Sequence, residues 1–385
     1  MNSRRATALF TLLLFALAAA LPVEAQRRKK KADEDFTQTL EVFPDPPAVR
    51  SAPTAQLSFY TVPMSAKGLL SQQVRDGLDQ LLRHARRAEV VKIRAFVAGT
   101  GDLRRVQAIV SEVFTKKRKS LPVLSVVQAG SLPMDGAQVQ LEATLVEQQP
   151  VNPAGLALLS GQLITRDGPL EVRVAPLAEQ SLANLEAAAR AAGAGPEAML
   201  RVSCFLSSLE DAGEVRLAVA RRFPKIEPLL VQTQRLPLQT LVECEGVARL
   251  AKAPGSDVVM LNPEGLPQSK AYSQVALIGA PTLVFAGAQL SFRYTEADAR
   301  LAFERLEKTL NSANSSLRQV VFLNTYPLSN QLAELVRRVR FDFLDPARPP
   351  ASTLLLFEGL PSMDGAFALE AVALPGASSK PERGP

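Results

Sequence analysis

The feature that most constrains this fold is a short sequence motif that occurs in two similar copies, more than two hundred residues apart. "LPMDGAQVQLEA" begins at Leu132 and "LPSMDGAFALEA" begins at Leu360, while a weaker version, "RLPLQTLVECEG", begins at Arg235. Self-similarity at roughly the length of a small domain predicts a repeated unit rather than one large fold. The repeat aligns three glutamates, Glu142, Glu245 and Glu370. We predict a structural or interface role for them.

The segments before each phrase follow one order of strands and helices. Stretches rich in β-branched residues, such as "VVKIRAFVAGT", alternate with stretches whose apolar residues recur at helical spacing. The predicted helical stripes are Val106, Ile109, Val110 and Val113; Val215, Val219 and Phe223; and Leu332, Leu335, Val336 and Val339. The unit is therefore β-(β)-α-β-α-β-β, with a closing hairpin-like pair. We predict an α+β fold in which a mixed sheet carries both helices on one face.

Turn-rich stretches such as "QQPVNPAG" and "APGSDV" divide the chain. The predicted organisation is a signal peptide at 1–25, a basic linker without regular structure at 26–49, three copies at 50–148, 149–252 and 258–375, and an unstructured tail at 376–385.

The first residues read as an export signal. Two arginines precede the apolar run "ATALFTLLLFALAAAL", and "VEA" at 23–25 is typical of a cleavage site. An uncleaved membrane anchor is the alternative, although the run is short for a span. The sequence thus predicts a periplasmic or secreted protein that keeps no stable membrane span after cleavage.

Five of the six net positive charges lie in the run Arg27–Lys31. Such a run is typical of a solvated tail, and binding to nucleic acid or to an anionic membrane is the alternative. The rest of the chain is nearly neutral and contains no Trp. We therefore expect no nucleic-acid partner.

Few residues are available for metal or nucleophilic chemistry. The chain contains one histidine, His84, and two cysteines, Cys204 and Cys244. This set nearly excludes a zinc site, and we expect neither a metal nor a cofactor. Both cysteines lie in apolar stretches predicted to be strands, which favours two buried free thiols over a disulfide.

Three sets of motifs resemble the Rid/YjgF family. "AYSQVALIGAPTLVFAGAQL" in the third copy is similar to the family's opening P-Y-S-Q-A-V and V-F-x-S-G-Q, and "LLSGQLITRDG" in the second contains S-G-Q. The "LP" phrases resemble the family's closing R-L-P-x-G-A-x-V-E-I-E-A. The resemblance spans about residues 50–374. It implies a fold like that of chorismate mutase, assembled as homotrimers with ligand clefts between subunits. Three linked copies would then form a monomeric pseudo-trimer.

The resemblance also implies an activity, the hydrolysis of enamines or imines. Family enzymes hold the substrate carboxylate with an Arg in P-A-R-S and position water with the first Glu of E-x-E. The Arg position carries Leu124, Leu230 and Ser352 in the three copies, so the clamp is lost. The water-positioning Glu survives as Glu243 alone. The remaining ligand-binding candidates are Ser160, Gly161, Gln162 and Tyr272.

Two hypotheses therefore stand. The chain is a non-catalytic Rid-like protein, with a scaffold role or with a recast cleft for a small molecule, which we favour. Alternatively, it is a diverged imine deaminase with one working cleft built from Glu243 and the residues Ser160 to Gln162. Tyr272 either contributes to that cleft or is a packed aromatic residue of a strand. Losing one charged bidentate contact costs roughly 1.5–3 kcal/mol, which alone would not abolish catalysis.

Overall fold

The computed structural model describes residues 41–99, 101–168 and 173–376, and all elements named below belong to the compact unit that begins at Pro44. Its α-helices form where the sequence has apolar stripes. Their bounds are α3 (Leu70–His84), α4 (Arg104–Lys116), α5 (Ala175–Ala191), α6 (Ala212–Arg222), α7 (Glu296–Asn311) and α8 (Asn330–Phe343). Every residue of the three predicted stripes is buried, which confirms those helices.

The strands form three sheets, numbered here in chain order of their central strands. Sheet 1 has the order β2-β5-β3-β4 and sheet 2 the order β10-β11-β6-β9-β7-β8. Sheet 3 has the order β1-β12-β16-β14-β15, with β13 paired to β16. The bounds in sheet 1 are β2 (Leu57–Thr61), β3 (Glu89–Ala98), β4 (Val123–Ala129) and β5 (Val139–Val146). Those in sheet 2 are β6 (Leu156–Asp167), β7 (Met199–Leu206), β8 (Leu229–Gln232), β9 (Gln239–Arg249), β10 (Val258–Leu261) and β11 (Val275–Ile278). Those in sheet 3 are β1 (Val49–Pro53), β12 (Thr282–Ala286), β13 (Gln289–Ser291), β14 (Val320–Pro327), β15 (Ala351–Leu354) and β16 (Phe367–Ala373).

The prediction of a closing hairpin-like pair was wrong in every sheet. The last two strands of each unit do not pair with each other. Instead, β4, β8 and β15 run parallel to the central strands β3, β7 and β14, while β5, β9 and β16 pair antiparallel on the opposite side. The connection that carries each "LP" phrase therefore crosses the end of the central strand, which a tight hairpin could not do.

Strand β1 and the strand pair β10–β11 each belong to a different sheet from the strand that follows them in the chain. Strand β1 pairs with β12 in sheet 3, although β2 follows it directly in sheet 1. Strand β11 pairs with β6 in sheet 2, although β12 follows it in sheet 3. The three sheets are thus linked by exchanged backbone pairing as well as by side chains.

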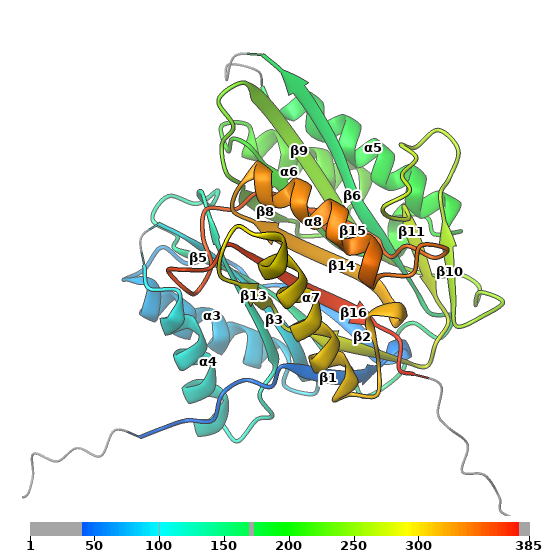
Figure 1. Cartoon of the computed structure of the whole chain (residues 1–385). Helices are drawn as coiled ribbons and strands as arrows, with labels where there is room; N and C mark the ends of the chain where they lie inside the picture. The colour runs from blue at the N-terminus through cyan, green and yellow to red at the C-terminus, as the bar shows by residue number, and fades with distance from the viewer. Residues whose placement is uncertain (1–40, 100, 169–172, 377–385) are drawn as a thin grey trace, which may run out of the picture. The chain divides into compact units, whose positions relative to one another are not determined.

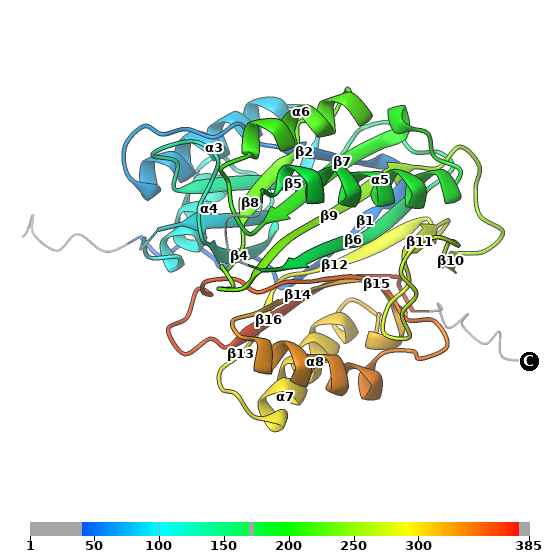
Figure 2. The same ribbon diagram turned by 90° about the horizontal axis from the view of Figure 1, so that it is seen from above.

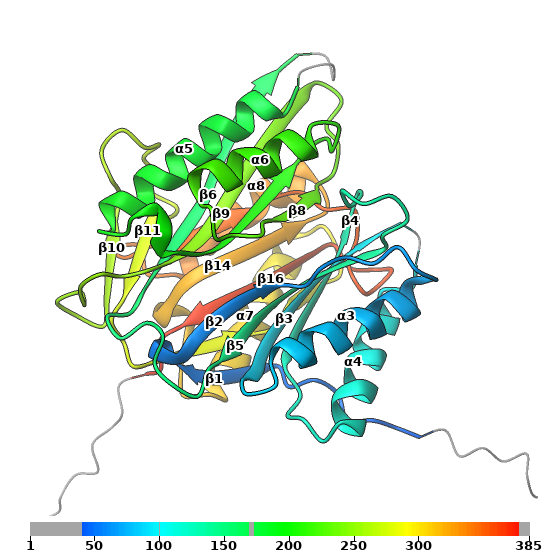
Figure 3. The ribbon, with the colours of Figure 1, turned by 180° about the vertical axis from the view of Figure 1, so that it is seen from behind.

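Each sheet packs one face against helices and the other against the other sheets. Figures 1 and 2 show α7 and α8 outside sheet 3, and Figures 2 and 3 show α3 to α6 outside the other sheets. Three apolar clusters lie between a sheet and its two helices. Two further clusters draw residues from all three sheets. This confirms the expectation that both helices of a unit lie on one face, and the second face is covered by the other sheets.

The repeated phrases contribute to one of these shared clusters. Leu132 and Leu360 are buried in it and Leu236 packs against it, together with the aromatic residues Phe205 and Phe357. Backbone bonds close the same end: Gly130 N–H donates to Gln232, Gln234 to Leu356 and Gln128 to Gly359, at 2.8–3.0 Å. The repeated leucines are therefore packing residues at the meeting point of the sheets.

The prediction of free thiols was wrong, because Cys204 and Cys244 form a disulfide. They are direct cross-strand partners on β7 and β9, with Cα atoms 4.1 Å apart. The sequence placed both in strands but did not reveal the register that brings them opposite each other. The predicted signal peptide and the run Arg27–Lys31 lie outside the described residues. Among the residues that are described, none of the helices has the length and apolar character needed to cross a membrane.

Candidate functional site

The candidate residues of the S-G-Q element lie where sheet 2 meets sheet 3. A bulge in β6 between Leu159 and Gln162 turns Ser160 and Gly161 out of the regular ladder. The Ser160 hydroxyl donates to the Ser273 carbonyl at 2.6 Å and accepts from the Ser352 amide at 2.8 Å. Ser160 is thereby held against Ser352, one of the predicted clamp positions.

Gly161 is needed because Glu243 occupies the space beside it. A Cβ at Gly161 would overlap the Glu243 carboxylate. Glu243 is only 4% exposed, and within the described part of the chain its Oε2 has no hydrogen-bond partner. Burial, and then the charge of Glu245, raise the pKa of Glu243 well above its usual range, and Arg337 opposes this only in part. Burial and the charge of Glu245 therefore favour the protonated form of Glu243.

Gln162 and Tyr272 complete the group, which we call the S-G-Q cleft after the ligand clefts that the family resemblance implies: Ser160, Gly161, Gln162, Glu243 and Tyr272. The Gln162 amide donates to the Gln274 side chain at 2.7 Å, two residues from Tyr272. Tyr272 is half-buried, and burial and then Glu243 raise the pKa of its hydroxyl. The structure thus brings together all five residues that the sequence singled out.

Two arginines of α8 near this cleft were missed by the sequence analysis. Arg340 and Arg337 are both close enough to Tyr272 to act against the rise of its pKa. Arg340 is 3% exposed, and its Nε and Nη2 lack hydrogen-bond partners among the described residues. Burial, and then Arg337, lower the pKa of Arg340 to about 10. The sequence did contain a sign that Arg340 is buried, because Arg340 follows Val336 by four residues and so lies on the apolar face of the helix.

The other predicted clamp positions carry no cation either. Leu124 pairs with Ile93 and packs against the core beneath α3 and α4. Leu230 pairs with Cys204 and lies in the core beneath α5 and α6. Arg94, Ser203 and Asn324 occupy equivalent positions on the three central strands. Leu124 pairs with the residue before Arg94, and Ser352 pairs with the residue before Asn324. Leu230, in contrast, pairs with the residue after Ser203. The register therefore makes Pro228, two residues earlier, the counterpart in sheet 2.

The three aligned glutamates meet at the centre, where the sheets face one another. In each sheet the glutamate pairs across to the central strand: Arg94 faces Glu142, Ser203 faces Glu245 and Asn324 faces Glu370. All three glutamates are at most 4% exposed. Their interface placement is as predicted, and Arg94 lies among all three of them.

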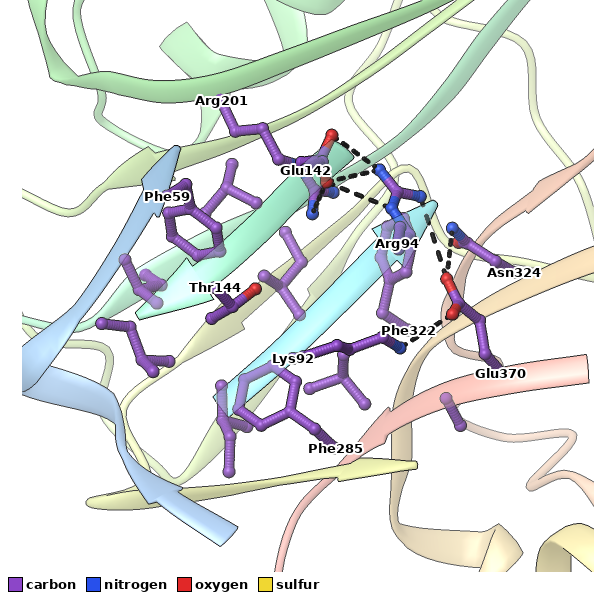
Figure 4. Close-up of a pocket in the computed structure, with 17 residues that line it drawn as sticks. Phe59, Lys92, Arg94, Glu142, Thr144, Arg201, Phe285, Phe322, Asn324 and Glu370 are labelled. Atoms are coloured by element: carbon purple, nitrogen blue, oxygen red, sulfur yellow. Dashed lines mark hydrogen bonds and ion pairs between the residues drawn. The ribbon is translucent and has the colours of Figure 1, made fainter. Parts of the chain in front are cut away.

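Arg94 contacts all three of these carboxylates, of which Figure 4 shows Glu142 and Glu370. Its Nη2 lies 2.7 Å from Glu142 and 2.8 Å from Glu245, and its Nη1 lies 3.9 Å from Glu370. Arg201 pairs with Glu142 and Glu245 at 3.2 and 3.1 Å, and Lys92 pairs with Glu370 at 2.9 Å. We call these six side chains the central ion-pair cluster: Lys92, Arg94, Glu142, Arg201, Glu245 and Glu370.

Opposite charges in this cluster act against the effect of burial on the pKa of Glu370, Glu142 and Lys92. Burial alone would raise the pKa of Glu370, but Lys92 and Arg94 lower it to about 2. Burial would likewise raise the pKa of Glu142, but Arg94 and Arg201 lower it. Burial lowers the pKa of Lys92, against the attraction of Glu370. Deletion of any one partner would leave a buried charge uncompensated.

Comparison with known proteins supports a family assignment for one segment. Residues 148–250 match the family model described as Endoribonuclease L-PSP, which is the model of the YjgF/Rid family. This match covers less than half of the chain. A search of curated proteins found no match.

Several solved structures are similar to parts of the chain. A YjgF family protein from Neisseria meningitidis, NMB1025, is 14% identical, with 31% of this chain and 95% of that chain covered and a TM-score of 0.23. The Rid family protein YyfB from Yersinia pestis is 17% identical, with 31% and 99% covered and a TM-score of 0.27. Rv2704 from Mycobacterium tuberculosis is 22% identical, with 30% and 98% covered and a TM-score of 0.22. From the family model, residues 148–250 are identified as a domain of the Rid/YjgF family.

Proposed function

We propose that this chain is an exported, single-chain Rid-like pseudo-trimer that binds a small molecule at the S-G-Q cleft without hydrolysing it. Three observations support the pseudo-trimer. The three sheets share one strand order around β3, β7 and β14. Their aligned glutamates converge on one cluster, and β1 and β11 exchange between sheets.

The cluster also explains why the copies would be joined in one chain. Arg94, Ser203 and Asn324 occupy equivalent places, facing the three aligned glutamates. A homotrimer would place the same residue there three times, so it could not put one arginine among three carboxylates. Fusion allows each copy to supply a different side chain, and it makes the association intramolecular.

The observation that carries the non-catalytic proposal is that Ser160 and Gln162 of the S-G-Q cleft are already hydrogen-bonded to neighbouring residues. Ser160 is bonded to Ser273 and Ser352, and Gln162 to Gln274. Glu243, the glutamate at the water-positioning place, is buried with its pKa raised well above the usual range, and the protonated form that this favours cannot accept a proton from water. The family's arginine clamp is absent from all three copies of the sequence.

A binding role is favoured over a scaffold role by unpaired polar atoms near the cleft. The described residues leave Glu243 Oε2 and the Nε and Nη2 atoms of Arg340 without partners. Buried donors and acceptors that stay unpaired cost about 1–3 kcal/mol each, and more for charged groups. A small molecule with a carboxylate or another oxyanion would supply the acceptor that Arg340 lacks.

The alternative, a diverged imine deaminase, is favoured by one observation. A carboxyl group with a raised pKa is the form that a general acid requires, and Arg340 could replace the lost clamp. The two functions make opposite predictions for turnover.

The deciding assay generates a 2-imino acid with an amino-acid oxidase and follows its decay with the purified protein. We expect no acceleration over a buffer control, and the same result for Glu243→Gln and for the exposed control Glu264→Gln. Robust acceleration that is lost in Glu243→Gln and kept in Glu264→Gln would establish the deaminase instead. Binding is measured separately, by calorimetry with small carboxylates. We expect heat of binding that Arg340→Met abolishes.

Export is the remaining part of the proposal. A disulfide persists in oxidising compartments, so the Cys204–Cys244 bond is what an exported protein would be expected to keep. N-terminal sequencing of protein from the native cell envelope should find a start near residue 26. An intact Met1 on protein from the cytosol would refute export.

A further inference from the structure

A cavity of about 40 Å³ is lined in part by side chains of the central ion-pair cluster (Figure 4), and no residue of the S-G-Q cleft lines it. One part of its wall is apolar, and the other part is formed by charged and amide side chains. The apolar part comprises Leu57, Phe59, Leu156, Leu158, Val247, Leu283, Phe285, Phe322 and Val372. The polar part includes Lys92, Arg94, Arg201 and Asn324. Three sheets contribute to both parts.

The carboxylates beside this cavity are already well bonded. Glu142 accepts from Arg94, Arg201 and Ser203, all within 3.2 Å. Glu245 accepts from Arg94, Arg201 and the Thr353 hydroxyl. Glu370 accepts from the Tyr326 hydroxyl at 2.7 Å and lies 2.9 Å from the Lys92 ammonium. Of the six carboxylate oxygens, Glu370 Oε2 alone lacks a hydrogen-bond partner among the described residues, and it lies 2.9 Å from the Lys92 ammonium.

The basic groups and one amide are not fully bonded. Arg94 Nη1 and Arg201 Nε are buried without a hydrogen-bond partner in the described part of the chain, and so is the acceptor Asn324 Oδ1. Arg94 is 4% exposed and Asn324 is 3% exposed, so bulk water does not satisfy them. Whatever occupies the cavity must accept hydrogen bonds from the arginines and donate one to the amide oxygen.

Charge decides which occupant fits. The central ion-pair cluster pairs three cations with three carboxylates, so its formal charge is zero. An anion would add an uncompensated buried charge, which is costly. A cation would find carboxylates whose lone pairs are largely in use. A neutral molecule that both accepts and donates meets the requirement, and water is the smallest one.

We propose that the central cavity is a hydration site that holds a cluster of about three water molecules, since one water needs roughly 10–15 Å³ of such volume. These waters accept from Arg94 Nη1 and Arg201 Nε and donate to Asn324 Oδ1. They complete the hydrogen bonding of the charged centre between the sheets.

A crystal structure of the full chain at high resolution, with a second crystal soaked in bromide, tests this assignment. We expect solvent peaks within hydrogen-bond distance of Arg94 Nη1 and Asn324 Oδ1, and no anomalous bromide signal in the cavity. A dry cavity would overturn the proposal, and a bromide peak would make the cavity an anion site instead.

The variant Asn324→Leu separates ordered solvent from density of another origin. It should lose the peak that donates to residue 324 and keep the peak beside Arg94, whereas the exposed control Asn311→Leu should keep both. Retention of every peak in Asn324→Leu would refute the assigned contact. The wild-type crystals decide the question even if this variant does not fold.

Discussion

Replacing Arg94 with methionine removes the one cation that touches all three aligned carboxylates. Methionine fills much of the same space, so the main change is electrostatic. Lys92 keeps its contact with Glu370, and Arg201 keeps its contacts with Glu142 and Glu245. Three buried carboxylates then share two cations, and Glu142 loses its shortest ion pair, of 2.7 Å.

The expected cost follows from the burial of the pair. Removing one partner of a buried ion pair typically costs about 3–5 kcal/mol, because the remaining charge is left without compensation. We therefore expect Arg94→Met to lower the free energy of unfolding by roughly that amount, near 3 kcal/mol if Glu142 takes up a proton. Arg94→Lys keeps the charge but loses the planar fork, so its loss should be smaller.

Urea denaturation followed by circular dichroism measures these differences. Arg104→Met is the matched control, because Arg104 is exposed and pairs only with its neighbour Asp102. We expect the control to be close to the parent. In the double variant Arg94→Met/Glu142→Gln, part of the loss should be recovered, since one uncompensated charge is removed. An Arg94→Met protein as stable as the Arg104→Met protein would refute the reasoning.

Three further outcomes are expected. Lys92 and Arg94 hold the pKa of Glu370 at about 2, so its ion pairs stabilise the fold above pH 4.5 and are lost as the pH falls from 4.5 toward 2. Glu370→Gln should flatten the curve of stability against pH over that range. A curve unchanged by the substitution would contradict this expectation. The raised pKa of Glu243 acts in the opposite direction: its contribution to stability is present below pH 4.5 and is lost as the pH rises through the raised value. Glu243→Gln should therefore be at least as stable as the parent at pH 7 by thermal melting. A clear loss of stability would count against the raised pKa of Glu243. Cys204→Ala/Cys244→Ala should lower stability by about 2–4 kcal/mol, whereas a melting temperature equal to that of the oxidised parent would show that the disulfide is not formed.

The sequence predicted what depends on periodic patterns. The helical stripes, such as Val106 to Val113 and Leu332 to Val339, appear where they were expected, because a buried face repeats at 3.6 residues. The alignment of the three glutamates also holds in three dimensions. Each pairs with its central strand at a matching position.

What the sequence did not predict depends on contacts between strands and between sheets. Arg94 is one charged residue in an apolar strand, and no local pattern shows that it meets carboxylates 48 and 151 residues away. The Cys204–Cys244 pair requires the register of β7 against β9. Arg340 shares a stripe with Val336, but its nearness to Tyr272 depends on how α8 meets the S-G-Q cleft.

The mass of the protein in solution tests the single-chain pseudo-trimer most directly. One chain of the full sequence has a mass of 41.4 kDa. If β1 and β11 complete neighbouring sheets within the same chain, sedimentation equilibrium should give the mass of one chain, less any cleaved leader, independent of concentration. A stable assembly of three chains, persisting on dilution, would contradict it, because the faces between the sheets would then be shared among chains.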